Sequence, residues 1–389
     1  MKKRILLVVR WPVGGIRSYL RYTYGQLPTE EYELSVVGPD TAEFRSCCDV
    51  LHSHSPRLFM AWSPTLRHLA PAVASACRRI RPHVVHSQGY SSGLVAAPVA
   101  WAYGARHLVS IHDMFTEEML RKPAVRVGRL LLGASLGVTD VVQPTGPAVE
   151  ANYLHYMDFW PARRAAVRMI PNGIDIPRFS GEETRDLRSE LGLSSRDLLI
   201  GFVGRFMAIK GFAVLLAAIE QMVSDKRLQD RNPVVVAVGS GGFLREEKAQ
   251  IKAKGLEGHV RFLPHTDQVA ETLRGLDVLV IPSISEASPI LPMEALVSGV
   301  PVVASDCPGL RATLEGTPAE LFPNRDSRAL ADILLSHAGS SRRDSAARFR
   351  PAAGHRFDSR MTALQVRDVL QELAISSRNY RADIRNARK

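Results

Sequence analysis

The run Val278-Leu279-Val280-Ile281-Pro282-Ser283, with a helical stretch after it and then Pro301-Val302-Val303-Ala304, decides the fold class of this chain. Each apolar run is short and does not alternate with polar residues, which is typical of a strand buried on both faces. The stretch between the runs is long enough for a helix, and parallel strands need such a connection. We therefore expect parallel strands joined by helices.

The same alternation of apolar runs and helical stretches extends along the whole chain. The predicted strands are Ile5–Val9, Leu34–Val37, Val84–His86, Leu108–Ile111, Val138–Val142 and Val167–Ile170 in the first half, and Leu199–Val203, Val234–Val238, Val260–Leu263, Val278–Ile281 and Pro301–Ala304 in the second. A chain of 389 residues exceeds the size at which one hydrophobic core stops growing, so two domains are expected. The predicted fold class is α/β, with two doubly wound parallel sheets.

The predicted domain boundary is Pro171-Asn172-Gly173-Ile174-Asp175-Ile176-Pro177. Two prolines flank an Asn-Gly turn signal, and proline interrupts both helices and strands. We expect this segment to be a linker.

Composition favours a soluble protein in a reducing compartment. The hydrophobic share of 46% and the charged share of 23% are those of globular proteins. The first residues hold too few apolar positions for a signal peptide, and no run approaches the ~20 apolar residues that span a bilayer. Four cysteines lack metal-binding spacing: Cys47, Cys48, Cys77 and Cys307. We expect a cytoplasmic protein.

The net charge of +11 is unevenly distributed. Residues 1–175 carry 20 Lys and Arg against 13 Asp and Glu, residues 176–340 carry 18 against 21, and residues 341–389 carry 12 against 5. A basic first half and tail can attract anionic lipid, an anionic glycan or nucleic acid, and charge alone does not choose among them. A basic surface that only contacts solvent explains the same numbers.

Four charged residues after two predicted strands could bind a phosphorylated sugar. Glu286 follows the strand Val278–Ile281, and Glu294 lies in the next helix, so both carboxylates can accept hydrogen bonds from hydroxyl groups. Arg205 and Lys210 follow an earlier strand and can neutralise a diphosphate. Because ligands of open α/β sheets bind outside the carboxyl ends of the strands, the two loops are expected to converge.

Glycines follow two other strands. Gly14 and Gly15 follow the first strand of the chain, and Gly239 follows Val234–Val238, so the backbone at these turns can approach a ligand closely. The first turn lacks the GxGxxG spacing, and no acidic residue closes the second strand at ribose-binding spacing. A nicotinamide dehydrogenase is therefore disfavoured.

Three motifs together resemble the retaining glycosyltransferases of the two-Rossmann GT-B fold, family four, also described as glycosyl transferases group 1. They are Gly204-Arg205-Phe206, Lys210-Gly211, and the run from Glu286 through Glu294 to Pro301. The resemblance implies two Rossmann-like domains with an interdomain cleft. It implies an acceptor domain over residues 1–171 and a nucleotide-sugar donor domain over 172–355. Residues 356–389 would form a helix that crosses back to the first domain, followed by a basic tail.

The resemblance also implies a set of site residues. His112 and Glu286 are the expected catalytic residues, and both would contact the transferred sugar. The expected donor-binding residues are Gly15, Arg205, Lys210, Gly239, Ile290, Leu291 and Glu294. In this set Arg205 and Lys210 meet the diphosphate, Glu294 meets the ribose, and the backbone of Ile290 and Leu291 meets the phosphates. The run Ala287-Ser288-Pro289-Ile290 departs from the family's frequent Gly-Phe-Gly-Leu or Gly-Phe-Pro-Leu, which leaves the donor sugar open.

The activity implied is transfer of a sugar, with retention, from a nucleotide diphosphate-sugar to a hydroxyl of a glycan or lipid-linked acceptor in polysaccharide or glycolipid biosynthesis. Two alternatives remain: a nucleotide-sugar epimerase or hydrolase of the same fold, and a non-catalytic nucleotide-sugar-binding subunit. Front-face attack and a covalent intermediate on Glu286 are both open. The histidines show no metal-ligand spacing and there is no Asp-x-Asp, so we expect neither a metal nor a cofactor, the nucleotide-sugar being a substrate.

Two stretches could contact an anionic membrane surface. One is Arg57–Trp62 with the helix that follows it, and the other is Leu120–Leu132, which mixes four cations with a leucine run. Ordinary Rossmann helices with a basic solvated face are the alternative. We expect no nucleic-acid partner, and a location in the cytoplasm with peripheral attachment to the inner face of the cell membrane.

Overall fold

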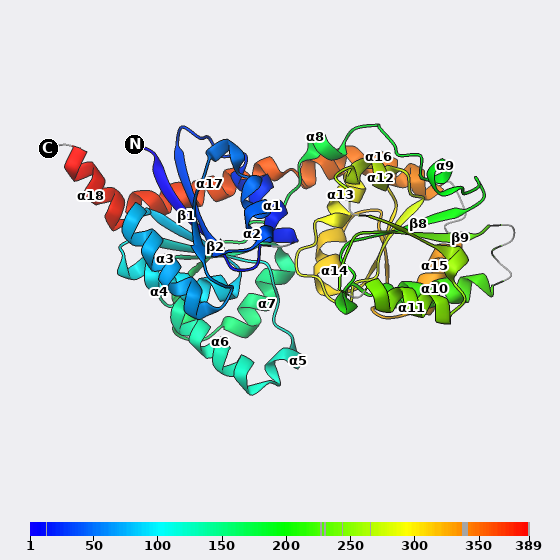
Figure 1. Cartoon of the computed structure of the whole chain (residues 1–389), viewed down its shortest axis with the longest axis horizontal. Coiled ribbons are helices and arrows are strands. Elements are labelled where there is room, and N and C mark those ends of the chain that lie inside the picture. Colours follow the sequence, from blue (N-terminus) through cyan, green and yellow to red (C-terminus); the bar gives the residue numbers. More distant parts are fainter. Residues whose placement is uncertain are drawn as a thin grey trace. The chain divides into compact units, whose positions relative to one another are not determined.

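The computed structural model describes residues 1–12, 14–225, 228, 231–242, 244–264, 266–336 and 341–387. The chain forms two compact units (Figure 1), one from Met1–Gly173 with Ser359–Lys389, the other from Ile174–Asp358. The chain therefore leaves the first unit and returns to it. Where it leaves and where it returns, the Ile174 N–H donates to the Phe357 carbonyl at 2.7 Å.

A parallel seven-stranded sheet forms the centre of the first unit, in the order β3-β2-β1-β4-β5-β6-β7. Its strands are β1 (Lys3–Val9), β2 (Tyr32–Pro39), β3 (Arg57–Ala61), β4 (Val84–Gln88), β5 (Arg106–Ile111), β6 (Val141–Pro144) and β7 (Ala166–Val167). The strand order reverses between β1 and β4, which is the arrangement of a doubly wound fold.

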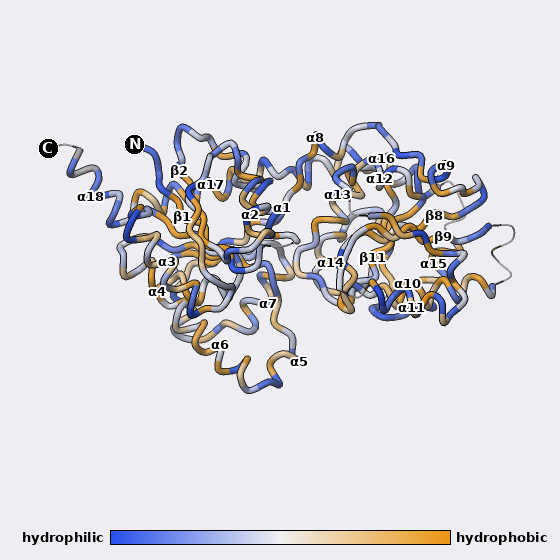
Figure 2. The backbone as a smooth tube through the Cα atoms, in the orientation of Figure 1, coloured by the Kyte–Doolittle hydropathy of each residue, from blue (hydrophilic) through white to orange (hydrophobic). Residues whose placement is uncertain are grey.

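Helices cover both faces of this sheet. They are α1 (Gly15–Tyr24), α2 (Ala42–Asp49), α3 (Leu66–Ile80), α4 (Tyr90–Ala102), α5 (Glu117–Leu120), α6 (Pro123–Leu136), α7 (Pro147–Met157), α17 (Ser359–Ser376) and α18 (Arg378–Ala387). The strand β1 shows why the sequence needs both layers. Its residues Ile5 and Leu7 pack with α1 and α17, whereas Leu6 and Val8 pack with α3 and α4. Figure 2 shows this strand as hydrophobic, because alternate side chains point to opposite faces and both faces are buried.

A parallel six-stranded sheet forms the centre of the second unit, in the order β10-β9-β8-β11-β12-β13. Its strands are β8 (Leu198–Val203), β9 (Pro233–Val238), β10 (Val260–Leu263), β11 (Val278–Ile281), β12 (Val302–Ser305) and β13 (Glu320–Phe322). The helices around it are α8 (Ile176–Phe179), α9 (Leu187–Leu191), α10 (Phe212–Val223), α11 (Leu244–Ala253), α12 (Val269–Arg274), α13 (Leu291–Val297), α14 (Pro308–Leu314), α15 (Ser327–Ser336) and α16 (Ser341–Arg356).

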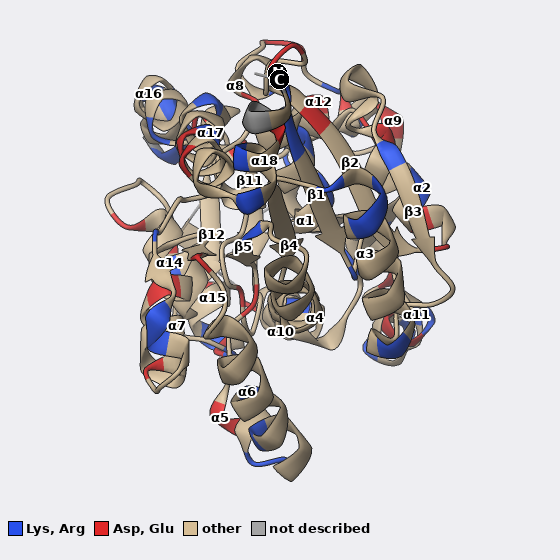
Figure 3. Ribbon diagram, turned by 90° about the vertical axis from the view of Figure 1, so that its left-hand side faces the viewer, with Lys and Arg blue, Asp and Glu red and all other residues tan. Residues whose placement is uncertain are grey.

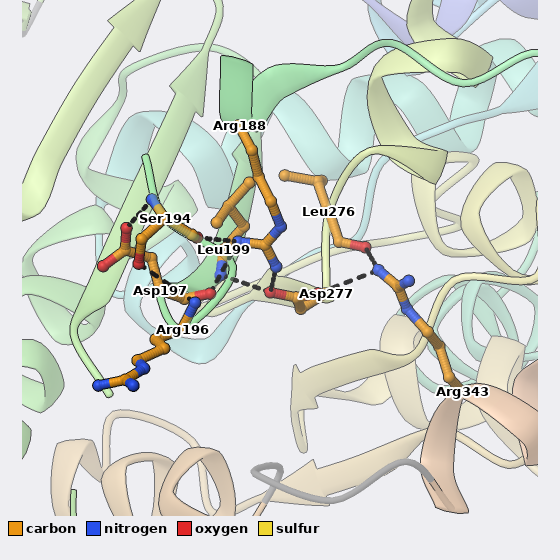
Figure 4. Close-up of polar contacts among 8 residues, drawn as sticks. All are labelled: Arg188, Ser194, Arg196, Asp197, Leu199, Leu276, Asp277 and Arg343. Carbon is orange, nitrogen blue, oxygen red and sulfur yellow. Dashed lines mark hydrogen bonds and ion pairs between the residues drawn. The ribbon is translucent and has the colours of Figure 1, made fainter. Parts of the chain in front are cut away.

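Asp277 joins four elements at the amino-terminal end of the second sheet (Figure 4). Its Oδ2 accepts hydrogen bonds from Arg188 Nη2 of α9 at 2.7 Å and from the Leu199 N–H of β8 at 2.8 Å. Its Oδ1 accepts one from Arg343 Nη2 of α16 at 3.0 Å. One carboxylate thus holds the beginning of β8 and the helices α9 and α16 next to the beginning of β11.

Two edge strands and one helix were not predicted. Arg57–Ala61, part of one of the two stretches that could contact a membrane, forms β3, whose backbone pairs with β2 and whose Phe59 is buried. The other edge strand, β13, has only three residues. Within the expected basic tail, Arg378–Ala387 form α18, and an ion pair of 2.6 Å between Asp383 and Arg4 ties that helix to β1.

The other strand boundaries differ little from prediction, with two exceptions. The predicted strand Val138–Val142 begins too early, because Val138 lies in a turn and β6 starts at Val141. The predicted strand Val167–Ile170 forms its ladder only at Ala166–Val167.

Candidate functional site

The loops after β8 and β11 meet backbone to backbone at the carboxyl end of the second sheet. Gly211 lies where the first of these loops enters α10, with a φ of +70°, and a Cβ atom there would lie 1.9 Å from the Pro282 carbonyl oxygen. The Ile284 N–H donates to the Ile209 carbonyl at 2.8 Å. Only glycine fits this position, so residue 211 brings the two loops together.

The loop after β9 lies equally close to the loop after β8. Gly239 has a φ of +145°, and a Cβ atom there would lie 1.9 Å from the Gly204 carbonyl oxygen. The Phe206 N–H donates to the Ser240 carbonyl at 3.0 Å, and the Phe206 ring is buried. Arg205, between these anchored neighbours, has an exposed side chain. Its guanidinium is therefore free to reach a ligand from a fixed backbone.

Lys210 and Glu286 form an ion pair within these loops. Lys210 Nζ lies 2.6 Å from Glu286 Oε1, and the two side chains are 28% and 13% exposed. Ser283 Oγ donates to the same carboxylate oxygen at 2.7 Å. An ammonium has three donors, so Lys210 can hold Glu286 and still attract a phosphate. The pair places a cation and a hydrogen-bond acceptor side by side.

Glu294 lies in the first turn of α13. Ile290 precedes this helix and Leu291 begins it, and the Glu294 N–H donates to the Ile290 carbonyl at 3.1 Å. Burial raises the pKa of Glu294 to about 7, an effect that the nearby charge of Arg178 opposes. The carboxyl group is therefore poised between its two protonation states near neutral pH.

His112 lies in the first unit, directly after β5. Its Nε2–H donates to Gln88 Oε1 at 2.9 Å, and its ring packs edge-on against the Tyr19 ring with 4.9 Å between centroids. Burial lowers the pKa of His112 to about 4, so the imidazole is neutral near pH 7. Gln88 is 2% exposed, and its Nε2 is buried without a hydrogen-bond partner in the part of the chain that the structure describes.

A buried polar network supports this histidine. His86 bonds Tyr24 through Nδ1 and Ser110 Oγ through Nε2, the latter at 2.6 Å. Ser110 Oγ donates to Gln143 Oε1 at 2.7 Å, and the Tyr19 hydroxyl donates to the same oxygen at 3.1 Å. These bonds link β4, β5 and β6 to α1, the helix that contacts His112.

Gly15 is the first residue of α1. A Cβ atom built on Gly15 would meet no atom within 4 Å, so space remains beside the backbone at this helix start. The preceding Gly14 has a φ of 61°, which favours glycine.

Of the nine predicted site residues, Gly15 and His112 belong to the first unit and the other seven belong to the second. Within the second unit the structure brings Lys210 and Glu286 together. Sequence reasoning missed Gln88 and Ser283. Both lie at strand ends, and Ser283 stands three residues before Glu286, so a search for hydrogen-bonding side chains at strand ends could have found them.

No group of three or more His, Cys, Asp or Glu side chains among the described residues is arranged to hold a metal ion. The four cysteines are buried and free.

The chain belongs to a family of glycosyltransferases. The family profile described as "Glycosyl transferases group 1" matches residues 183–353, and the profile described as "Glycosyltransferase Family 4" matches residues 13–178. These comparisons confirm the resemblance read from the sequence motifs.

Named relatives support this membership, and a solved structure supports the fold. The chain is 30% identical over 295 residues to a D-inositol 3-phosphate glycosyltransferase of Xylanimonas cellulosilytica, covering 71% of this chain and 67% of the relative. It is 28% identical over 285 residues to the Corynebacterium jeikeium protein of that name, covering 68% of this chain but only 66%, less than two thirds, of the relative. Anabaena HepE, solved with UDP and glucose, has a TM-score of 0.80 at 21% identity, covering 95% of this chain and 100% of HepE. The predicted GT-B fold class is thereby confirmed.

Proposed function

We propose that this protein transfers a sugar, with retention of configuration, from a nucleotide diphosphate-sugar to a hydroxyl of a glycan or lipid-linked acceptor. The observation that carries the proposal is the Lys210–Glu286 pair at 2.6 Å, among loops that glycines hold together at the carboxyl ends of β8, β9 and β11. Open α/β sheets bind ligands at this edge. The UDP and glucose in the HepE complex are consistent with such a donor, and the name of the relatives is consistent with glycosyl transfer.

In this proposal the protein acts by positioning and electrostatics. Arg205 and Lys210 stabilise the diphosphate as it departs and gains charge. Glu286 accepts hydrogen bonds from sugar hydroxyls, Glu294 binds the ribose, and neutral His112 hydrogen-bonds the transferred sugar. The bond from the anomeric carbon to the phosphate oxygen breaks, a bond to the acceptor oxygen forms, and the acceptor proton passes to a phosphate oxygen.

The backbones of Ile290, Leu291, Gly239 and Gly15 complete the proposed site. We propose that the first two approach the phosphates, and that the glycines let the donor approach the chain closely. No resident metal or cofactor is needed for the steps above. The proposed acceptor is anionic and lipid-linked, presented at a membrane surface to which the enzyme attaches peripherally.

The proposal is tested with radiolabelled UDP-, GDP- and ADP-sugars, with and without a lipid-linked acceptor extract. Transfer of label to an acceptor supports it. Label that changes only its sugar stereochemistry indicates an epimerase, release of free sugar alone indicates a hydrolase, and binding without turnover indicates a non-catalytic subunit.

The donor site is tested separately by substitution. Arg205→Ala and Lys210→Ala should each lower turnover roughly thirtyfold to a thousandfold, equivalent to about 2–4 kcal/mol of transition-state stabilisation. Lys252→Ala, which removes an exposed lysine from α11, is the matched control and should leave turnover unchanged. Equal rates for all four proteins would overturn the donor-site assignment.

A further inference from the structure

The segment of α5 and α6, residues 117–136, presents an apolar face to solvent. Figures 1 and 3 show that both helices stand out from the rest of the first unit. Four large apolar side chains are 44–58% exposed there: Met119, Val127, Leu130 and Leu131. Val127, Leu130 and Leu131 have helical i, i+3 and i+4 spacing, so they share one face of α6. The opposite face packs inward through Leu132 and Leu136, which are buried.

Cations border this apolar face. Arg121, Lys122 and Arg126 are exposed, and Figure 3 shows basic residues where α5 passes into α6. Two acidic residues, Glu117 and Glu118, are exposed on α5. The three cations outnumber them, and the first unit as a whole carries 27 Lys and Arg against 15 Asp and Glu.

Arg129, which the sequence grouped with these cations, does not belong to the exposed face. Its Nη1 donates to the Tyr156 carbonyl, and its guanidinium lies 5.1 Å from the centroid of the Phe159 ring. Arg129 thus anchors α6 to the unit, and it is not available to a partner.

We propose that this α5–α6 face attaches the protein to an anionic lipid bilayer, with its four apolar side chains seated at the boundary between headgroups and acyl chains. An apolar helix face with flanking cations is the pattern that binds such surfaces. The α6 helix has 14 residues, fewer than the ~20 that cross a bilayer, so it lies in the plane of the surface. No described helix is long and apolar enough to span a membrane.

The inference rests on the proposed function in one respect, because a lipid-linked acceptor would be presented at this surface. It also adds an apolar contribution to the electrostatic attraction expected from the charge distribution. Seating a large apolar side chain in lipid strengthens binding by roughly tenfold or more, whereas a cation near an anionic surface contributes about fivefold. Salt should therefore weaken the attachment without abolishing it.

Vesicle flotation of the full-length protein tests the proposal, with phosphatidylcholine vesicles that contain or lack phosphatidylglycerol, at low and high salt. The wild type should float with the anionic vesicles. The double variant Leu130→Ser/Leu131→Ser should lower the bound fraction about tenfold or more at both salt concentrations. Arg121→Gln/Lys122→Gln should lower it mainly at low salt.

Two matched controls show whether vesicle binding depends on the α5–α6 face or on exposed apolar and basic side chains anywhere on the protein. Met361→Ser/Leu364→Ser removes two exposed apolar side chains from α17, and Arg78→Gln/Arg79→Gln removes an adjacent pair of exposed cations from α3. Both controls should bind vesicles like the wild type.

Three results would overturn the proposal: no flotation of the wild type on anionic vesicles at low salt, equal losses in the α6 variants and their controls, or a protein dimer in sedimentation that Leu130→Ser/Leu131→Ser dissociates. Flotation needs neither donor nor acceptor. If the protein binds vesicles through this face but transfers no sugar, the membrane proposal stands and only the proposed function is refuted.

Discussion

Glu294 couples the stability of the second unit to pH. Its pKa is raised from 4.5 to about 7 by burial. Between these values the folded chain keeps a proton that the unfolded chain has lost, so stability falls as pH rises through this window. Glu294→Gln has no such proton to lose. As the pH rises from about 5 to about 8, the free energy of unfolding of this variant should increase by on the order of 3 kcal/mol relative to that of the wild type, measured by chemical denaturation.

Glu246→Gln, at an exposed position of α11, is the control for this substitution. An equal pH response in all three proteins would show that Glu294 titrates normally.

Gln88 fixes the proton of His112 on Nε2, because Gln88 Oε1 accepts the hydrogen bond from that nitrogen. Gln88→Leu should remove this preference and lower turnover roughly tenfold, about the worth of one hydrogen bond. Gln88→Glu should raise the pKa of His112 from about 4, since a carboxylate beside the ring favours its charged form. Nitrogen-15 NMR of His112 and the pH profile of turnover measure both effects. Identical histidine spectra in the wild type and Gln88→Leu would refute the assignment.

At the scale of elements, Asp277 is the connection whose loss should matter most to the second unit. Asp277→Ala leaves Arg188 and Arg343 without their shared carboxylate and the Leu199 N–H without its acceptor. An unpaired group at a partly buried site is costly, so unfolding should become easier by about 2–4 kcal/mol. Thermal or urea unfolding measures the change.

Asp306→Ala is the control for that substitution. Asp306 pairs with Arg311 at 2.5 Å, but both side chains are considerably exposed, at 35% and 61%. Exposed ion pairs contribute little, so this variant should unfold like the wild type. Comparable losses of stability in the two variants would mean that Asp277 contributes no more to folding than an exposed ion pair does.

Central strands were predictable because burial on both faces leaves an uninterrupted apolar run. The central strand Val278–Ile281 is fully buried and matches its predicted limits for this reason. The edge strand Arg57–Ala61 was missed because it is half exposed and begins with a cation. The β-propensity of these residues does not predict that their backbone pairs with β2, because that pairing depends on residues far away in the sequence.

The site was predictable to a similar degree. Motif spacing indicated Lys210 and Glu286 as neighbours in function, and the structure adds their 2.6 Å contact. Gln88 and His112 lie 24 residues apart on adjacent strands, and only the parallel register of β4 and β5 brings them together. A motif within one loop can be recognised from neighbouring residues, whereas the contact between Gln88 and His112 depends on how two strands align.

At the scale of the whole molecule, the first unit should depend on the last segment of the chain. The buried residues Val366, Val369, Leu370 and Leu373 of α17 lie in the same core as β1 and α1. Exposing each would cost about 1.5–3 kcal/mol, and the sum is comparable to the 5–15 kcal/mol that stabilises a typical domain.

We therefore expect a fragment of residues 1–173 to lose cooperative unfolding and to bind hydrophobic dyes, whereas a fragment of residues 174–358 should keep a sharp transition. Circular dichroism and dye fluorescence measure the two properties. A cooperatively folded fragment 1–173 with no dye binding would show that α17 is dispensable to its core.

The return of the chain to its first unit has a consequence for biosynthesis. A ribosome releases the amino-terminal residues first, and in most proteins the domain made first also folds first. Here residues 174–358 must be synthesised before α17 emerges, which takes roughly ten to forty seconds at synthesis rates of about 5–20 residues per second. During this delay the oldest part of the nascent chain carries an uncovered core face, a surface that a chaperone can protect, while the younger unit folds ahead of it.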